Sequence, residues 1–414
     1  MARIFKKFAF FVFCLGFCAA FLSADHWILD AKVNKLPKNF LEKIEMVGGK
    51  LVKSWDFLGI AVVEFPDEKT AFLFEEQGFR VMPDVYADWI PDEGQFATLH
   101  LGEDETYYGY QWHLPLIQAD MAWETGLTGS GVRIAVLDSG IYYPHPDLGS
   151  NVDFASSATF VPGTTDFIDD LGHGSWVAGI IAAADNGWGA IGVAPNATLI
   201  AVKVMNSSGE GAFSWIIGGL IHAVMVDADI INMSIGTLLP KGRFTASLCA
   251  TANKLMNWAA AHDVLVVTAA GNENLNLNHS RNNVYLPAEA GNCIAISATG
   301  PADLPAYYTN YGTSLVWVAA PGGDSSYGLL GNVFSTFYTP PGETGYWFAW
   351  MDGTSGSAPN AAGVAALIIE KYGRMSVGKL KNILKNTADD LGKPGADDYY
   401  GRGRVNAYKA VTKK

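Results

Sequence analysis

Five short, mostly apolar runs, rich in β-branched residues, recur in the C-terminal part of the chain and limit what it can fold into. They span residues 132–137, 198–204, 230–233, 264–268 and 293–297. They lack polar/apolar alternation, which is typical of strands buried on both faces. Helix-like stretches follow them, over residues 174–184, 214–223, 246–261 and 357–372. This alternation predicts a three-layer α/β domain with a mostly parallel sheet flanked by helices.

The composition is that of a folded, acidic protein. The chain has 414 residues, of which 49% are hydrophobic and 17% charged, so it can hold one large core and a smaller domain. The formal net charge of −13 makes nucleic acid or an anionic membrane surface an unfavourable partner.

Three residues with catalytic chemistry stand where the predicted elements begin or end. Asp138 closes the first run, His173 lies in Gly-His-Gly-Ser before a helix-like stretch, and Ser355 follows Gly-Thr before another. A carboxylate can orient an imidazole, which can take a proton near neutral pH from a serine that attacks a carbonyl. The order Asp, His, Ser differs from the orders of α/β-hydrolases and chymotrypsin. Each residue alone is equally compatible with a structural role.

Together these motifs resemble the subtilisin family of serine endopeptidases, from about residue 111 to about residue 408. The resemblance implies that Ser355 is the nucleophile, His173 the general base and Asp138 the group that orients it. It also implies that the Asn272 side chain and the Ser355 backbone N–H stabilise the oxyanion. We expect an endopeptidase that forms an acyl-enzyme and needs no redox or organic cofactor.

The chain departs from the family pattern beside two of these residues. Ser175 and Trp176 stand where the family usually has Thr and His, and Gly356 and Ser357 stand where it has Met and Ala. No chemical group that the mechanism needs is lost, but Trp176 is bulky enough to change the shape beside the site. A non-catalytic secreted scaffold that kept the fold is therefore an alternative.

The resemblance also implies a substrate cleft. The residues expected around the pocket for P1, the residue before the cleaved bond, are Ser234, Ile235 and Gly236 on one wall, Ala269 and Gly271 on the other, and Tyr285 at the base. Glycine-bearing backbone lets a peptide bind as an added strand. Because Tyr285 stands where Gly can occur, we expect a shallow pocket and a broad enzyme that prefers small or medium apolar P1 residues. A dedicated processing protease is the alternative.

A structural calcium site is implied as well. The expected ligands are the side chains of Asp147, Asn186 and Gln111 and the backbone carbonyls of Ala184, Trp188 and Ala190. Such oxygen donors suit a hard cation. An ordinary Asn-Gly turn beside a surface Asp is the alternative interpretation.

The N-terminus predicts export. Basic residues at positions 3, 6 and 7 precede the apolar residues 8–22 and the small residues at 23 and 24, as in a signal peptide over residues 1–24. A membrane anchor is the alternative. We expect a secreted monomer without stable membrane association. Of the four cysteines, Cys249 and Cys293 then remain, either as a disulfide or as buried thiols.

Residues 25–105 predict a small α+β domain ahead of a peptidase domain at 106–414. The expected order β-α-β-β-α-β is the ferredoxin-like motif. It is similar to the inhibitory propeptides of the subtilisin family, which implies that it blocks the cleft against polypeptide substrates until it is cut. A permanent accessory domain is the alternative. Acidic residues at 92, 93 and 103–105 predict an exposed linker over residues 91–108 that holds the processing site.

Overall fold

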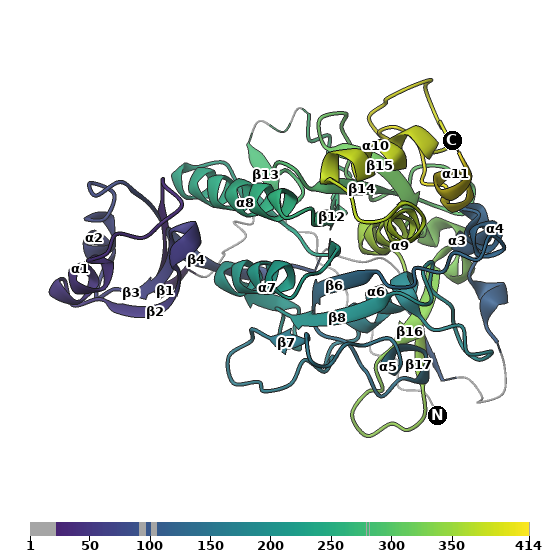
Figure 1. The fold of residues 1–414 in the computed structure, drawn as a ribbon, viewed down its shortest axis with the longest axis horizontal. Helices are drawn as coiled ribbons and strands as arrows, with labels where there is room; N and C mark the ends of the chain where they lie inside the picture. Colours follow the sequence, from purple (N-terminus) through teal and green to yellow (C-terminus); the bar gives the residue numbers. More distant parts are fainter. Residues whose placement is uncertain (1–21, 91–96, 101–105, 279, 281, 414) are drawn as a thin grey trace, which may run out of the picture.

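The computed structural model describes residues 22–90, 97–100, 106–278, 280 and 282–413. Figure 1 shows a small N-terminal unit that projects from a larger unit. Most of the predicted signal peptide lies outside the described residues, although the first strand begins at Leu22, within that segment. No helix among the described residues has the length and apolar character needed to cross a membrane.

A parallel sheet forms the centre of the larger unit. Its seven strands, all within the described residues, are in spatial order β15 (Val316–Pro321), β14 (Ile294–Thr299), β12 (Leu265–Ala269), β10 (Ile230–Met233), β6 (Arg133–Asp138), β8 (Thr198–Lys203) and β7 (Ala158–Thr159). Each neighbouring pair runs parallel. The predicted fold class is confirmed, and the five apolar runs correspond to β6, β8, β10, β12 and β14.

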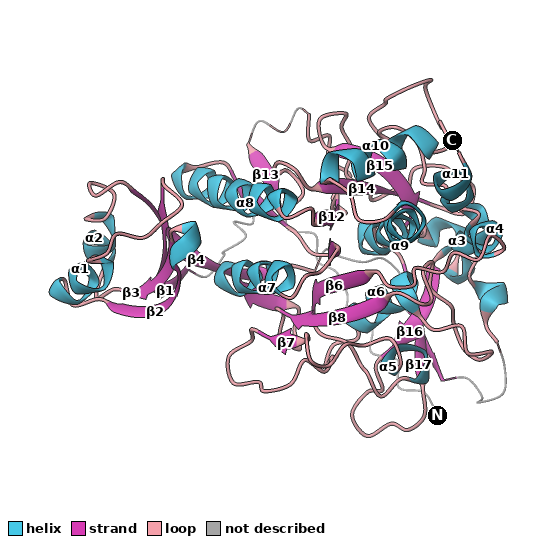
Figure 2. Ribbon diagram, in the orientation of Figure 1, coloured by secondary structure: helices cyan, strands magenta, loops and turns pink. Residues whose placement is uncertain are grey.

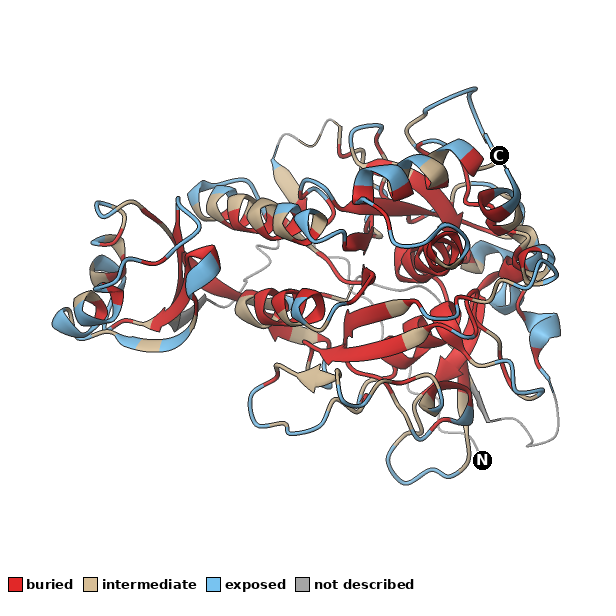
Figure 3. Ribbon diagram, in the orientation of Figure 1, coloured by how far each residue is buried: buried red, intermediate tan, exposed pale blue. Residues whose placement is uncertain are grey.

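Helices cover both faces of this sheet (Figures 1 and 2). One face carries α6 (His173–Ala182) and α9 (Thr354–Tyr372), and the other carries α7 (Phe213–Met225) and α8 (Arg243–Ala261). Figure 3 shows that the strands between these layers are buried almost throughout, as a parallel sheet covered on both sides requires.

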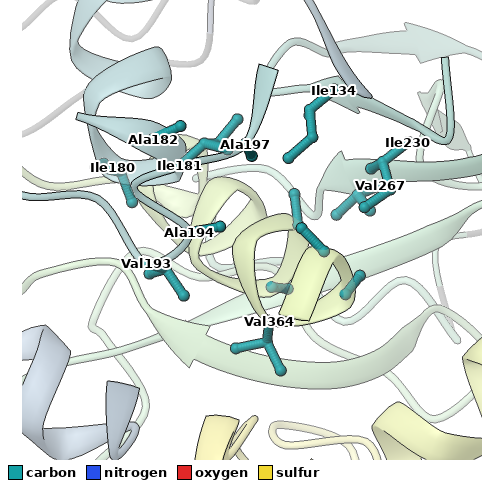
Figure 4. Close-up of a cluster of buried hydrophobic side chains, with 14 of the residues drawn as sticks. Ile134, Ile180, Ile181, Ala182, Val193, Ala194, Ala197, Ile230, Val267 and Val364 are labelled. Carbon is teal, nitrogen blue, oxygen red and sulfur yellow. The ribbon is translucent and has the colours of Figure 1, made fainter. Parts of the chain in front are cut away.

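The side chains of β6 alternate between the two layers. Ile134 and Val136 belong to the core cluster that contains α6 and α9, whereas Ala135 and Leu137 belong to the cluster that contains α7 and α8. Figure 4 shows Ile134 with its neighbours in the first of these clusters. Both faces of the strand are therefore apolar between the two charged residues at its ends, Arg133 at the amino end and Asp138 at the carboxyl end.

The N-terminal unit has its elements in the predicted order. They are β1 (Leu22–Ala31), α1 (Phe40–Met46), β2 (Lys50–Trp55), β3 (Ile60–Glu64), α2 (Glu68–Phe72) and β4 (Phe79–Asp88), with a short 3-10 turn η1 (Asp56–Leu58) before β3. The strands pair antiparallel in the order β2-β3-β1-β4. The two helices cover one face of this sheet through buried residues such as Phe40, Ile44 and Ala71.

This unit is attached to α7 and α8 by polar contacts as well as apolar ones. Strand β4 continues into the larger unit, where it pairs antiparallel with β9 (Glu210–Ala212). The buried Asp84 carboxylate accepts hydrogen bonds from Ser214 N (2.9 Å) and Oγ (2.6 Å) in the first turn of α7. The buried Asp30 carboxylate is paired with Lys254 of α8.

The prediction of an exposed linker over residues 91–108 is wrong in part. Strand β5 (Ala97–His100) pairs antiparallel with β17 (Trp347–Met351), which in turn pairs with β16 (Val333–Phe337). Tyr107 is also buried. Backbone hydrogen bonds to an open strand edge require no apolar pattern, so no pattern in the sequence predicts β5. The acidic residues Asp92, Glu93, Glu103, Asp104 and Glu105 lie outside the described residues.

Shorter elements surround the sheet. They are the helices α3 (His113–Leu116), α4 (Ala119–Trp123), α5 (Pro146–Gly149), α10 (Val377–Thr387) and α11 (Ala407–Thr412), the paired strands β11 (Thr237–Pro240) and β13 (Asn283–Leu286), and the 3-10 turns η2 (Tyr108–Tyr110), η3 (Ser325–Tyr327) and η4 (Leu329–Gly331).

Candidate active site

A carboxylate and an imidazole meet at the carboxyl edge of the sheet, because Asp138 ends β6 and His173 begins α6. His173 Nδ1 lies 2.7 Å from Asp138 Oδ1, and the two side chains are 3% and 0% exposed. Asp138 Oδ1 also accepts the backbone N–H of Ser139 at 2.7 Å. This geometry suits a carboxylate that holds the imidazole in one tautomer, with the proton on Nδ1.

A second buried carboxylate, Asp169, organises the loop that leads into α6. Its Oδ1 accepts from Ser139 Oγ (2.8 Å) and Gly172 N (2.9 Å). Its Oδ2 accepts from Ser175 N (2.8 Å) and Oγ (2.6 Å). The carboxylate therefore connects the residue after Asp138 to the residues on either side of His173. Sequence analysis missed Asp169, because an Asp in a polar loop gives no signal until the fold assembles its partners.

Ser355 lies in the first turn of α9 and is fixed to the end of β10. Its Oγ donates to the Ser234 carbonyl at 3.3 Å, and Ser234 Oγ donates to the Ser355 carbonyl at 2.8 Å. Helix α9 begins directly after Gly353. The unpaired backbone N–H groups of a helix start carry a partial positive charge, which favours negative charge that develops beside Ser355.

The Asn272 side chain is oriented by the residue before Ser355. Its Oδ1 accepts both the backbone N–H (2.9 Å) and the hydroxyl (2.7 Å) of Thr354. Thr354 Oγ1 also accepts the N–H of Gly271 at 3.0 Å. Because the amide oxygen faces Thr354, the amide nitrogen lies on the other edge of the group, as an oxyanion donor requires. Thr354 was not identified from the sequence as an orienting residue.

The chain that leaves the N-terminal unit after β4 runs between two segments of the larger unit, at Gly209 and at Gly236. Trp89 N donates to the Gly209 carbonyl (3.2 Å), and the Trp89 carbonyl accepts Gly236 N (2.6 Å). The indole is fully buried, lies 6.0 Å from the ring of Phe213 in a stacked geometry, and donates from Nε1 to the Gly211 carbonyl at 2.8 Å. These contacts are those of a peptide bound as an added strand. Sequence analysis missed Trp89 as well.

Tyr285 fills the space between the two predicted pocket walls. A Cβ atom on Gly236 would lie 2.4 Å from a Tyr285 ring carbon, and a Cβ atom on Gly271 would lie 2.6 Å from another. The wall residues Ile235 and Ala269 are fully buried. Burial holds the pKa of the Tyr285 phenol well above its usual value, and no described residue hydrogen bonds to its hydroxyl. The ring therefore occupies the base where P1 was expected to enter.

The residues predicted to bind calcium come together in part. Asp147 is fully buried, and its Oδ1 and Oδ2 accept from Asn186 Nδ2 and Ala190 N, each at 2.9 Å. Burial raises the pKa of Asp147 to about 7. The described part of the chain contains no group of three or more His, Cys, Asp or Glu residues suited to a metal ion. Any cation here would depend mainly on amide and carbonyl oxygens.

Three further predicted ligands, Gln111, Trp188 and Ala184, take part in hydrogen bonds of the same loop. Gln111 is engaged at both ends of its amide, since Nε2 donates to the Ile191 carbonyl (2.8 Å) and Oε1 accepts Ile191 N (3.0 Å). Trp188 N donates to Asn186 Oδ1 at 3.0 Å, and the Ala184 carbonyl accepts Asn186 N at 3.0 Å. Gln111 therefore holds the loop through the backbone of Ile191, and its Oε1, which accepts one hydrogen bond, keeps a second lone pair for a cation.

The two cysteines are free thiols, so the disulfide alternative is wrong. Cys249 lies on α8, and the buried Cys293 donates from Sγ to the Ala290 carbonyl at 2.8 Å. Burial raises the pKa of Cys293 to about 11. A buried, protonated thiol behaves as a small apolar side chain and is inert.

Comparison with known proteins agrees with this geometry. The sequence pattern of the subtilase family matches residues 129–403. Subtilisin Savinase from Lederbergia lenta is 40% identical over 300 residues, which cover 72% of this chain and 98% of that protein. Alkaline elastase YaB from Bacillus sp. (strain YaB) is 38% identical over 404 residues, which cover 95% of this chain and 93% of that protein.

Solved structures share the fold. The epidermin leader peptide processing serine protease from Staphylococcus aureus superposes with a TM-score of 0.78 at 21% identity, over 94% of this chain and 99% of that one. A lanthipeptide protease superposes with a TM-score of 0.68 at 28% identity, over 74% and 96%.

The fold and the relatives define a class of enzyme, the serine endopeptidases, which hydrolyse polypeptides. Within that class, the chain belongs to the subtilase family. The resemblance inferred from the motifs is confirmed, and the alternative of a non-catalytic scaffold is not supported.

Proposed function

We propose that Asp138, His173 and Ser355 act as a catalytic triad; the 2.7 Å contact between the first two carries this proposal. Ser355 Oγ attacks the scissile carbonyl carbon while His173 Nε2 takes its proton, and Asp138 stabilises the imidazolium. The tetrahedral oxyanion accepts from the Ser355 backbone N–H and the Asn272 amide. His173 then protonates the leaving amine, and a water molecule that His173 activates releases the acyl group.

A fluorophosphonate probe tests this assignment directly. The purified, processed protein should incorporate one probe on Ser355, because only an activated serine attacks the phosphorus centre at a useful rate. Absence of label on processed protein would contradict the assignment.

The N-terminal unit acts, in this proposal, as an intramolecular inhibitor of a secreted, monomeric enzyme. Trp89 hydrogen bonds to the backbone of Gly209 and Gly236, and β5 (Ala97–His100) is paired with β17, so the larger unit holds the chain at Trp89 and again from Ala97. This supports a processing point between Trp89 and Ala97. It also supports a cleft that stays closed until the cut unit leaves.

A small P1 residue is the substrate preference that Tyr285 supports. Its ring lies close to both Gly236 and Gly271, and so it takes the volume that a large P1 side chain would need. Alkaline elastase YaB, which is similar over nearly the whole chain, is named as an elastase. We therefore propose cleavage mainly after small apolar residues.

Replacing Tyr285 with glycine should open the pocket. We expect kcat/KM for a peptide with P1 Phe to rise by about 100-fold relative to its counterpart with P1 Ala, because a few buried methylene-sized groups change discrimination by this order. A matched pair of chromogenic peptides measures the ratio. Tyr285→Phe is the control, since it keeps the ring volume and should keep the wild-type ratio. An unchanged ratio in the glycine variant would place the P1 site elsewhere.

A calcium ion fits the Asp147 loop as a structural ligand in this proposal. Asp147 is a buried carboxylate that accepts hydrogen bonds from two neutral amide groups, those of Asn186 and Ala190, so a cation would compensate its charge. The side chains of Asn186 and Gln111 and the carbonyls of Ala184, Trp188 and Ala190 would complete the set. When bound, the ion would stabilise the fold and take no part in the reaction.

Chelation should then destabilise the processed enzyme in a pH-dependent way. Without a cation, the raised pKa of Asp147 (about 7) means that folding favours its protonated form, so stability falls as pH rises from about 4 through 7. We expect EDTA to lower the thermal midpoint by about 5–10 °C at pH 8 and by much less at pH 5.

Calorimetry on probe-inactivated enzyme, which cannot digest itself, measures this shift. Asp147→Asn is the control: it removes the charge, and its midpoint should respond little to EDTA at either pH. An EDTA shift that is equal at both pH values, or absent, would remove calcium from the proposal.

A dedicated processing protease is the second candidate. The filled P1 pocket favours it, because a narrow pocket restricts the sites that can be cut. Two proteins that share the fold are named as a leader peptide processing protease and a lanthipeptide protease. Denatured casein separates the two candidates, since a broad enzyme cuts it at many small residues and a dedicated one leaves it largely intact.

A further inference from the structure

The two departures from the family pattern lie against each other in the fold. Trp176 is on α6, one helical turn after His173, and Gly356 directly follows Ser355 on α9. A Cβ atom built on Gly356 would lie 2.8 Å from Cη2 and 3.4 Å from Cζ2 of the Trp176 indole. Real Cβ atoms essentially never approach a neighbour as closely as the first of these distances, so the indole occupies the space of a side chain at 356.

The glycine at position 356 is explained by the lack of room for a side chain, and not by its backbone conformation. Gly356 is not among the glycines with positive φ, so its backbone is open to any residue. Alanine is the better helix former, and glycine in a helix lowers stability. The feature that favours glycine here is the ring of Trp176.

The indole is held so that it cannot easily give way. Trp176 is fully buried, and its Nε1 donates to the Val333 carbonyl at 3.1 Å. Its own carbonyl accepts from Ser335 Oγ at 2.9 Å. Both partners belong to β16, which therefore fixes the indole ring through Val333 and the backbone of Trp176 through Ser335. The ring centroid lies 6.3 Å from that of the His173 imidazole.

We propose that Trp176 is a positioning residue: its contact with Gly356 sets the separation of α6 and α9, and hence the alignment of His173 with Ser355. This inference rests on the proposed roles of those two residues. The family has His at the position of Trp176 and Met at the position of Gly356. Here a larger side chain at position 176 is combined with no side chain at position 356. Each departure is tolerated only because the other is present.

The single change Gly356→Ala tests the contact. The added methyl group must push the indole or the turn that carries Ser355, and misplacement of reacting groups by about 1 Å costs about 100-fold in rate. We expect kcat to fall by about 100-fold, KM to stay within about threefold, and the thermal midpoint to stay close to that of wild type.

A second change should rescue the first. Trp176→Phe removes the benzo-ring atoms that meet residue 356, so the double variant W176F/G356A should recover most of the lost kcat, to within about tenfold of wild type. Trp176→Phe alone should lose less than G356A. Gly378→Ala, in α10 with no atom within 4 Å of the added carbon, is the control for a helical Gly-to-Ala change and should be neutral.

Two results would overturn the inference: a G356A variant with wild-type kcat, or a double variant no faster than G356A. The rate of fluorophosphonate labelling separates this failure from failure of the triad. If wild type labels and G356A labels equally fast, the triad stands and the positioning role is wrong. If correctly processed wild type does not label, the triad assignment itself is wrong.

Discussion

Replacing Ser355 with alanine should lower kcat for peptide hydrolysis by about 10⁶-fold, a figure taken from the equivalent change in subtilisin itself. The expected loss is this large because alanine lacks the attacking oxygen, which Ser355 Oγ provides at the start of α9, where it donates to the Ser234 carbonyl. The residual rate would come from the Asn272 donor and from substrate binding alone.

The same variant should also remain uncut. If Ser355 cleaves its own precursor, the purified variant should migrate as a full-length precursor that takes up no fluorophosphonate, whereas wild type should appear as two fragments. Mass spectrometry of the wild-type fragments would locate the cut, which we expect between Trp89 and Ala97.

Ser357→Ala supplies a matched control for this experiment. It is the same substitution two positions along α9, at a buried hydroxyl to which no described residue hydrogen bonds. It should keep activity and processing. If the Ser355 variant were processed and active while this control behaved as wild type, Ser355 could not be the nucleophile.

The parts of the site that were predictable are those encoded by short stretches of sequence. The run that ends at Asp138 and the Gly-rich turns before His173 and Ser355 each specify a local backbone. A parallel sheet then gathers such residues at one edge without further information. This is why the fold class and the residues of the proposed triad could be predicted before any coordinates.

The groups that orient these residues depend on contacts between segments far apart in the sequence. Asp169 accepts hydrogen bonds from both Ser139 and Ser175. Thr354 forms hydrogen bonds with Gly271 and Asn272, which precede it by more than 80 residues. Neither residue belongs to a periodic pattern, so only the folded arrangement identifies it.

The fit between Tyr285 and the pocket walls, and that between Trp176 and Gly356, likewise depend on contacts between distant segments. Tyr285 was expected to make the base shallow, but the closeness of its ring to both walls follows from the path of β13 and not from residue type. Trp176 and Gly356, taken one at a time, look like weaknesses beside the catalytic residues. Their physical meaning is visible only when α6 and α9 are placed together.

Replacing Lys254 with methionine should weaken the hold of the N-terminal unit on the enzyme by about 100-fold or more. Lys254 Nζ is paired with the Asp30 carboxylate, which is completely buried, and also donates to the carbonyls of Ala31 (2.8 Å) and Leu58 (3.0 Å). Removing one partner of a buried ion pair typically costs about 3–5 kcal/mol, because the other charge stays desolvated. Arg80, 2.9 Å from Asp30, compensates part of this cost, so the lower end of that range applies.

Dilution of the cut but still associated complex measures this effect, with hydrolysis of a chromogenic peptide as the readout. In wild type, activity should appear slowly as the N-terminal unit dissociates. In the Lys254→Met variant, peptidase activity should appear at a much higher protein concentration than in wild type, and after a shorter lag. The kcat of the freed enzyme should be unchanged, since Lys254 lies on α8 and its ammonium group donates to Asp30, Ala31 and Leu58 of the N-terminal unit.

Lys50→Met is the control for loss of a lysine in the same chain. Its ion pair with Glu64 lies within the N-terminal unit, with side chains 78% and 45% exposed, and exposed pairs contribute little. Its dissociation should match wild type. If both lysine variants released the enzyme equally, the effect would reflect net charge and not the buried pair. If neither did, apolar contacts and the strand that carries Trp89 would be sufficient to hold the inhibitor, and the Asp30–Lys254 pair would serve only to fix its orientation.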